Sequence, residues 1–241
     1  MHIFFQQNKK SISAGFTRHD AGFTLIELLV VLAIISIMTF VLLVQQSKFD
    51  SSTVLRSLAY NVALSVRQAQ VYGVSVKESS LGTSVFAQAY GLYFNPAASP
   101  NSYLLFADAN GDQRYTSSPD ETVTTFKINN TYKVAEVCVI KSDGTRRCSG
   151  GDDSSGAGTI NTLTVLFKRP NPDAQLLGLK SDGTFVLGDF ADQYINAYVQ
   201  IKATDSTLRG IHISQTGQVS VDQLCSSTSV PAATANNPHC I

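Results

Sequence analysis

The most constraining part of the hydrophobic pattern is a long apolar run from Phe23 to Val44, in which Glu27 is the single charged residue. At about 1.5 Å of rise per residue, a helix of this length crosses the roughly 30 Å hydrocarbon core of a bilayer. A carboxylate inside such a span costs on the order of 2.5–3.5 kcal/mol on insertion scales. The run therefore predicts a transmembrane helix, and Glu27 predicts a partner that the run itself does not contain.

Beyond this run, apolar residues recur with a helical period and polar residues stand between them, which predicts an amphipathic helix. The apolar positions of this stripe are Val54, Leu58, Val62 and Val66, with Leu55, Ala59 and Ala69 beside them. Gly73 is a plausible end of the helix. We therefore expect one helix from Phe23 to about Tyr72, with its second half packed under a sheet.

From Val74 onward, short runs of β-branched and aromatic residues alternate with clusters of turn-forming residues, which predicts strands. The pairs Asp143-Gly144 and Asp182-Gly183 mark tight turns. The predicted strands are Val85–Phe94, Ser102–Ala107, Thr122–Ile128, Lys133–Lys141, Thr162–Lys168, Thr184–Val186, Ala197–Lys202, Leu208–Ser214 and Val219–Val221. The whole pattern predicts an α+β fold, in which a long N-terminal transmembrane and amphipathic helix packs on a C-terminal antiparallel β-sheet domain.

The sequence Gly-Phe-Thr-Leu-Ile-Glu at residues 22–27, followed by the apolar residues 28–35, resembles the N-terminus of type IV pilins and type II secretion pseudopilins. In that family a membrane peptidase cuts after the glycine and methylates the new terminal amine. The resemblance implies cleavage between Gly22 and Phe23 and N-methylation of Phe23. It also implies that Glu27 faces the terminal ammonium of a neighbouring subunit in a filament, which supplies the missing partner.

An ordinary signal peptide explains the run less well, because its apolar region has only about 7–15 residues and a small-residue cleavage site follows it. Lys9, Lys10 and Arg18 precede the run, in agreement with a cytoplasmic N-terminus. The resemblance therefore implies a single-pass protein of the bacterial inner membrane with a periplasmic or extracytoplasmic globular domain. The chain would then enter a pilus or pseudopilus.

Three further segments, Arg56–Gln70, Tyr103–Asp112 and Arg209–Val219, resemble the H-type minor pseudopilins and related minor pilins. Members of that group lie at or near filament tips and help to prime assembly. The implied partners are the prepilin peptidase/methyltransferase, other pilins or pseudopilins, and an inner-membrane assembly platform. The expected segments are the leader 1–22, the transmembrane half-helix 23–44, the amphipathic half-helix 45–73, the β-rich domain 74–224 and a disulfide-stapled tail 225–241.

One loop has oxygen-bearing side chains at alternate positions, as in calcium-binding loops. These candidate ligands are Asp108, Asn110 and Asp112. A further carboxylate is available downstream from Asp120 or Glu121, but Gln113 stands where an EF-hand loop needs glycine. A turn stabilised by Asp and Asn side chains between two strands explains the same residues. Calcium and a simple turn both stay open, and no other cofactor is expected.

The chain has four cysteines, and export from the cytosol would favour disulfides, for which three pairings exist. A three-residue hairpin loop at 142–144 would set Cys138 directly opposite Cys148. Cys225 with Cys240 would then close the tail, as in the C-terminal loop of many pilins. Neither pair has the spacing of zinc ligands.

Charge and motifs limit the function classes. The formal net charge is zero, and loss of the leader would leave a slightly acidic chain, so nucleic acid is not expected as a partner. No nucleophile elbow, zinc-binding helix motif or phosphate loop is present, so an enzyme is not expected.

The sequence favours a minor pilin or pseudopilin with a structural role. The alternative is a binding module carried on a pilus, either an adhesin or a DNA-uptake minor pilin. Secretion pseudopili and retractable pili use the same N-terminus, so this choice stays open.

Overall fold

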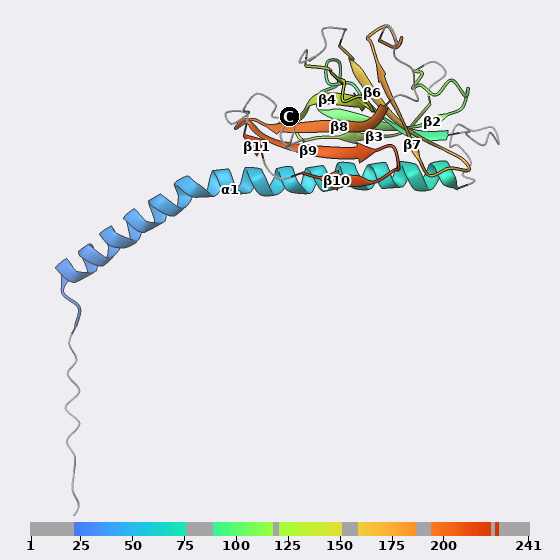
Figure 1. Cartoon of the computed structure of the whole chain (residues 1–241). Coiled ribbons are helices and arrows are strands. Elements are labelled where there is room, and N and C mark those ends of the chain that lie inside the picture. The colour runs from blue at the N-terminus through green and yellow to red at the C-terminus, as the bar shows by residue number, and fades with distance from the viewer. Residues whose placement is uncertain are drawn as a thin grey trace, which may run out of the picture. The chain divides into compact units, whose positions relative to one another are not determined.

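The computed structural model describes residues 22–75, 89–117, 121–150, 159–186, 194–222 and 225–226, without the side chains of 44–51 and 225–226. The chain divides into two compact units, Met1–Gln46 and Ser47–Ile241. One long helix, α1, begins in the first unit and ends in the second, and the strands β1 to β11 all belong to the second unit (Figure 1).

Helix α1 runs without interruption from Leu25 to Val74, which is 50 residues. The predicted helix is confirmed, but it continues past Gly73, which the sequence suggested as its end. A Cβ at Gly73 would overlap the backbone oxygen of Phe167. This glycine therefore permits close packing of the helix on a strand, and the helix ends just beyond it.

In the first unit, Leu25–Leu43 is long and apolar enough to cross a membrane, with a mean hydropathy of 2.8 and none of it buried within the protein. Two hydroxyl side chains in this stretch donate to the carbonyl four residues earlier: Ser36 to Leu32 at 2.8 Å and Thr39 to Ile35 at 2.7 Å. Their polar groups are thus satisfied within the helix, which suits an apolar environment. The helix fits a membrane anchor.

In the second unit, the helix buries one face against the sheets, as predicted, and the buried row combines part of the predicted four-residue row with the residues named beside it. The fully buried residues are Leu55, Ala59, Val62, Val66 and Ala69. Val54 is 47 % exposed, and its assignment to the packed face was wrong. A strict four-residue spacing drifts by about 40° per step around a helix of 3.6 residues per turn. A row that alternates spacings of four and three stays in contact with the sheets.

The strands form two antiparallel sheets. The first has the order β3-β2-β1-β6-β7, and the second has the order β10-β9-β8-β4-β5 with β11 paired to β9. The first sheet contains β1 Ala89–Phe94, β2 Ser102–Asp108, β3 Thr122–Lys127, β6 Thr162–Lys168 and β7 Ala174–Leu179. The second contains β4 Tyr132–Lys141, β5 Arg146–Cys148, β8 Tyr194–Ala203, β9 Thr207–Ser214, β10 Val219–Val221 and β11 Cys225–Ser226. The predicted α+β fold with an antiparallel domain is confirmed.

The first sheet is buried on both faces along β6, six of whose seven residues are buried. Leu163 and Val165 join the main core, which also contains the buried row of α1. Leu166 on the other face packs in a smaller cluster with Phe106, and Tyr115 and Phe185 pack against that cluster. This second cluster lies on the face of the sheet that does not hold the helix.

The sequence missed β7 and β11, and it implied β5 only through the predicted hairpin that sets Cys138 opposite Cys148. Strand β7, Ala-Gln-Leu-Leu-Gly-Leu, lacks β-branched residues and forms because it pairs with β6 over its whole length. The predicted strand Thr184–Val186 is reduced to one isolated bridge between Phe185 and Leu179. Residues 85–88 of the predicted first strand lie outside the described residues.

Several hairpins close through three-residue loops whose last residue has a positive φ. Gly144 has a φ of 86°, and its N–H donates to the carbonyl of Lys141 at 3.0 Å. Gly183 and Gly217 occupy the same place in two other loops. Ser206 occupies it in the β8–β9 loop, with a φ of 68°. Glycine adopts this conformation at little cost, whereas serine is strained in it.

Candidate functional site

The N-terminal end of α1 is organised by Thr24. The backbone N–H of Glu27 donates to the Thr24 hydroxyl oxygen at 3.3 Å, and the N–H of Leu28 donates to the Thr24 carbonyl at 3.2 Å. Thr24 is thus the N-cap of the helix, and Glu27 is its third helical residue. A Thr followed three residues later by a Glu forms the capping-box pattern.

This arrangement places the Glu27 carboxylate in the first turn of α1. The first turn carries the positive end of the helix dipole, which stabilises a carboxylate by about 0.3–1 kcal/mol. The interaction reduces the cost of a charge in an apolar segment but leaves the negative charge in place. The resemblance implies a cation for Glu27, the terminal ammonium of a neighbouring subunit, and this pairing stays a prediction.

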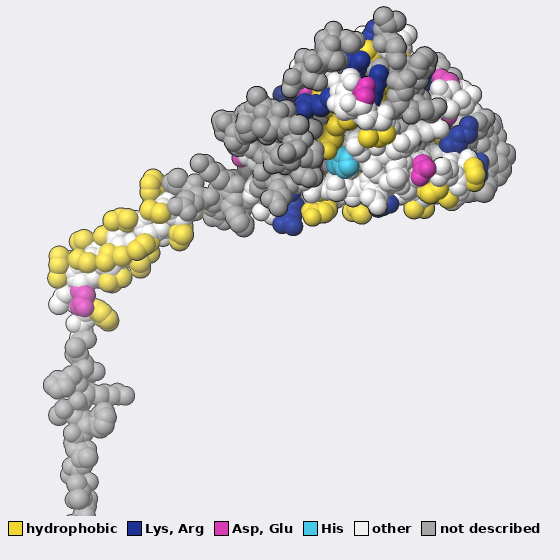
Figure 2. Space-filling model, viewed as in Figure 1, with side chains coloured by type: hydrophobic (Ala, Val, Ile, Leu, Met, Phe, Trp, Pro, Cys, Tyr) yellow, Lys and Arg dark blue, Asp and Glu magenta, His cyan; other side chains and the backbone are white. Residues whose placement is uncertain are grey.

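The segment presents an apolar surface around its whole circumference. Every described side chain from residue 22 to residue 43 is exposed, and Phe23 is 82 % exposed. Figure 2 shows hydrophobic side chains covering this part of the helix, with one acidic side chain near its start. A continuous apolar surface of this kind marks contact with lipid or with other apolar helices. The arrangement therefore suits insertion and helix packing.

Residues 17–43 match the family model of the prokaryotic N-terminal methylation motif. This N-terminus is type IV pilin-like. The match includes the predicted processing residues Gly22 and Phe23 and the assembly residue Glu27. Comparison with curated proteins and with solved structures finds no match. The resemblance at the N-terminus is confirmed, whereas the likeness to the H-type subgroup stays a prediction.

Thr24 is the helix cap that the sequence analysis did not assign. The signal for it was present, because Thr24 and Glu27 have the capping-box spacing just before an apolar run. The leader residues 1–21 lie outside the described residues, so the structure gives no environment for that side of the predicted cleavage site.

The second candidate site, the loop after β2, folds as a network of turns. The Asp108 carboxylate accepts hydrogen bonds from the N–H groups of Gly111 at 2.7 Å and Gln113 at 3.2 Å. Asn110 accepts from the N–H of Asp112 at 2.9 Å. Gln113, which stands where a calcium loop needs glycine, has a φ of 66°. The loop thus adopts the left-handed conformation at this position without a glycine.

Glu121 completes the loop from the start of β3. Its carboxylate accepts from the N–H groups of Ala109 at 3.1 Å and Thr116 at 2.9 Å, and its side chain is fully buried. Burial raises the pKa of Glu121, and the nearby Asp108 charge raises it further. Burial likewise raises the pKa of Asp108. Both carboxylates thus bind N–H groups of the loop for which the sequence left calcium and a simple turn open, and a direct test of calcium is given in the Discussion.

Cys138 on β4 and Cys148 on β5 form a disulfide, with the two residues directly opposite in register. This is the pairing that the three-residue loop predicted.

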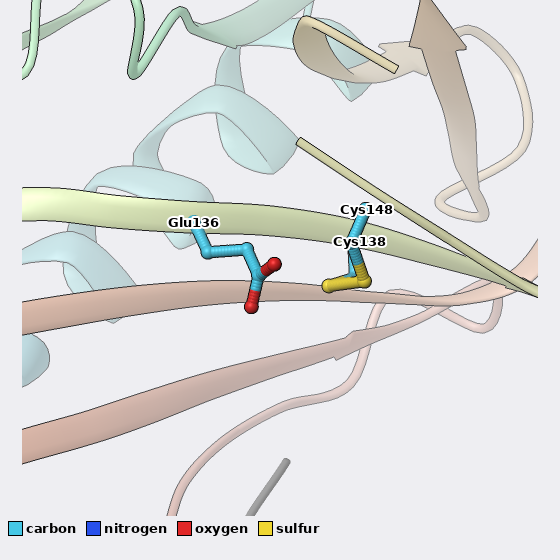
Figure 3. Close-up of side chains that lie close together, drawn as sticks. All are labelled: Glu136, Cys138 and Cys148. Carbon is cyan, nitrogen blue, oxygen red and sulfur yellow. A yellow bond between two sulfur atoms is a disulfide. The ribbon is translucent and has the colours of Figure 1, made fainter. Parts of the chain in front are cut away.

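Glu136 lies on the same side of β4, within 4.8 Å of both sulfur atoms (Figure 3). In the described part of the chain these three residues are the one group close enough to share a metal ion. The sulfurs are bonded to each other, so the group is a disulfide with a neighbouring carboxylate. The Cys225 side chain and Cys240 lie outside the described residues, and their pairing stays a prediction.

Proposed function

We propose that this protein is a minor pilin or pseudopilin, a structural subunit without catalytic activity that joins a membrane-anchored filament. The observation that carries the proposal is the methylation motif placed on a capped, fully exposed apolar helix with a single carboxylate in its first turn. The H-type likeness of the later segments favours a minor subunit, and the whole-chain function is inferred from these features together.

The proposed pathway begins in the inner membrane, with the N-terminus in the cytoplasm and the globular domain on the other side. The prepilin peptidase/methyltransferase cuts between Gly22 and Phe23 and methylates the amine of Phe23. An assembly platform then extracts the subunit into a filament of other pilins or pseudopilins. The exposed apolar helix packs among other helices there, and Glu27 pairs with the ammonium of a neighbouring Phe23.

The experiment is to co-express the chain with a prepilin peptidase, extract it from membranes and determine its N-terminus by mass spectrometry. We expect N-methyl-Phe23 as the first residue. A matched control is Gly22→Leu, because no atom lies within 4 Å of the position of a Cβ at Gly22, so the substitution causes no clash. This variant should stay uncut. A wild-type chain that keeps residue 1, or that is cut beyond Val44, would refute the proposal.

The neighbouring genes would distinguish a secretion pseudopilus from a retractable pilus. An outer-membrane secretin encoded with further pseudopilins would assign the chain to a secretion pseudopilus, whereas a retraction ATPase would assign it to a retractable pilus.

A further inference from the structure

A pocket of about 460 Å³ lies at the strand ends of the first sheet, on the face that does not hold the helix. Its lining comes from the end of β1, the β1–β2 and β2–β3 connections, the start of β6 and the turn after β7. The volume is within the range of about 300–1,000 Å³ that small-ligand sites occupy. All of these segments belong to the second unit.

Two tyrosines line the pocket. The rings of Tyr93 and Tyr115 have their centroids 5.0 Å apart, and Tyr115 packs edge-on against Phe106 at 5.8 Å. The Tyr93 hydroxyl accepts a hydrogen bond from the Asn95 amide at 3.2 Å, and the Tyr115 hydroxyl bonds with that of Thr122 at 3.1 Å. Each ring is thus held by its hydroxyl group and by packing on its neighbour, and together the two rings form an aromatic surface.

The amide and hydroxyl side chains of Asn95, Asn161, Thr162 and Ser181 also line the pocket. Asn161 accepts a hydrogen bond from the N–H of Ser181 at 3.1 Å, which holds its amide in place. An amide that accepts one bond in this way keeps two N–H donors. The Asp182 carboxylate also lines the pocket. It accepts hydrogen bonds from the N–H and the hydroxyl of Thr184 and thereby stabilises the turn that contains both residues.

Two cationic residues, Arg114 and Lys180, line the pocket from different connections. The Arg114 guanidinium lies over the ring of Phe185, 5.3 Å from its centroid, so its plane is oriented by a cation–π contact. A planar guanidinium held in this way matches a carboxylate with two parallel hydrogen bonds, whereas lysine acts as a point charge.

We propose that this pocket binds a saccharide that carries a carboxylate, of the uronic acid type. The apolar face of the sugar ring stacks on the tyrosines, its hydroxyls bond with the amides and hydroxyls of the rim, and its carboxylate pairs with Arg114. A peptide fits less well, because peptides are commonly held along an open strand edge. This pocket opens instead over the connections at the strand ends. The binding site is independent of the filament role proposed above.

The test uses the full-length chain in detergent micelles and titrates it with trigalacturonate by calorimetry. The methyl ester of the same trisaccharide is the matched neutral probe. We expect the acid to bind at least tenfold more tightly than the ester. Arg114→Gln should reduce the affinity for the acid at least tenfold and leave the affinity for the ester within twofold. Lys133→Gln, an exposed lysine outside the pocket, is the control and should change neither.

Three results would overturn the proposal. The wild-type chain could fail to bind either probe at millimolar concentration, or it could bind acid and ester equally. Triglutamate could also bind as tightly as trigalacturonate, which would show that the pocket recognises any carboxylate. If the melting temperature of Arg114→Gln falls, Arg114→Lys replaces it, because lysine keeps the positive charge but cannot form the two parallel hydrogen bonds. The proposal then requires this variant to weaken binding of the acid more than binding of the ester.

Discussion

The hydroxyl oxygen of Thr24 accepts a hydrogen bond from the backbone N–H of Glu27 at 3.3 Å. Thr24 thereby sets the first turn of the helix, in which the Glu27 carboxylate stands. The helix cap and the assembly residue are thus one local unit. The proposed pairing of Glu27 with a neighbouring subunit can be separated by substitution from its position in the helix cap.

The first prediction concerns the charge of Glu27. Glutamine also fits the third position of a capping box, so Glu27→Gln keeps the helix start while removing the charge. We expect the variant to be cleaved normally but to enter filaments poorly, because the neighbouring ammonium loses its counter-charge. Co-purification with other pilins measures incorporation, and Glu27→Ala should be equally defective. Incorporation of Glu27→Gln at the wild-type level would rule out the charge pairing.

The second prediction concerns Thr24. Thr24→Ala removes the N-cap, which costs about 0.5–2 kcal/mol of helix stability. Amide hydrogen exchange at Glu27 and Leu28 should accelerate in detergent micelles, while exchange near Val66 should not change. Thr24→Ser keeps the capping oxygen and should behave like the wild type. Equal protection in Thr24→Ala would show that the cap does not determine where the helix begins.

The disulfide gives the third prediction. Replacing Cys138 and Cys148 together by alanine removes a cross-link that is worth roughly 2–4 kcal/mol for a loop of this kind. At about 2–4 °C per kcal/mol, the melting temperature should fall by roughly 4–16 °C. Ser142→Ala in the loop of the same hairpin is the control and should have little effect.

Peptide mapping without reduction should recover Cys138 linked to Cys148 and Cys225 linked to Cys240. A peptide that links Cys138 to Cys225 would instead show the tail folded back onto the sheet.

The fourth prediction is the pH dependence of the acidic loop. The folded-state pKa values of Asp108 and Glu121 are both raised by burial. Between the ordinary value of about 4 and the raised value, the folded state holds the proton more strongly than the unfolded state does. These groups therefore stabilise the fold at acid pH, and this contribution is lost as the pH rises through the raised pKa values.

Carbon NMR of the two carboxyl groups measures these titrations. Asp108→Asn should lower the pKa of Glu121, because it removes a neighbouring negative charge. Asp173→Asn, in an exposed loop elsewhere, should not. Midpoints at or below the ordinary values would contradict the prediction.

Calcium can be tested in the same sample. We expect neither calcium nor a chelator to move the melting temperature, because the carboxylate oxygens of Asp108 and Glu121 already accept hydrogen bonds from the loop. Binding at a hundredfold excess over Kd would add about 2.7 kcal/mol and raise the melting temperature by roughly 5–10 °C. Such a rise, abolished in Asp112→Ala, would establish the calcium site instead.

The fifth prediction concerns the strained loop between β8 and β9. Ser206 has the positive φ that glycine adopts in the equivalent loops, so Ser206→Gly should stabilise the protein by about 0.5–1 kcal/mol. Gly144→Ala is the reciprocal variant. A Cβ there meets no atom within 4 Å, so its expected loss of about 1 kcal/mol comes from the backbone alone. Chemical denaturation measures both, and a destabilised Ser206→Gly would show that the serine side chain contributes more than its strain costs.

The sequence by itself determined the features that depend on near neighbours in the chain. The apolar run, the capping pattern of Thr24 and Glu27, and the hairpin that places Cys138 opposite Cys148 are all local. Their spacing follows from helix rise and turn geometry, which the residue types specify directly. The prediction of the N-terminal motif and of the α+β fold succeeded for this reason.

Tertiary structure decided the rest, because the deciding partners are distant in sequence. Leu55 is buried and Val54 is exposed, because the sheets cover the helix face that follows the 3.6-residue period. Strand β7 exists because β6 pairs with it, against the weak preference of its own residues. Glu121 enters the Asp108 loop only because the antiparallel pairing of β2 and β3 brings the two together. Pairing and burial over long separations carry no local signal, so these features became visible only in the folded chain.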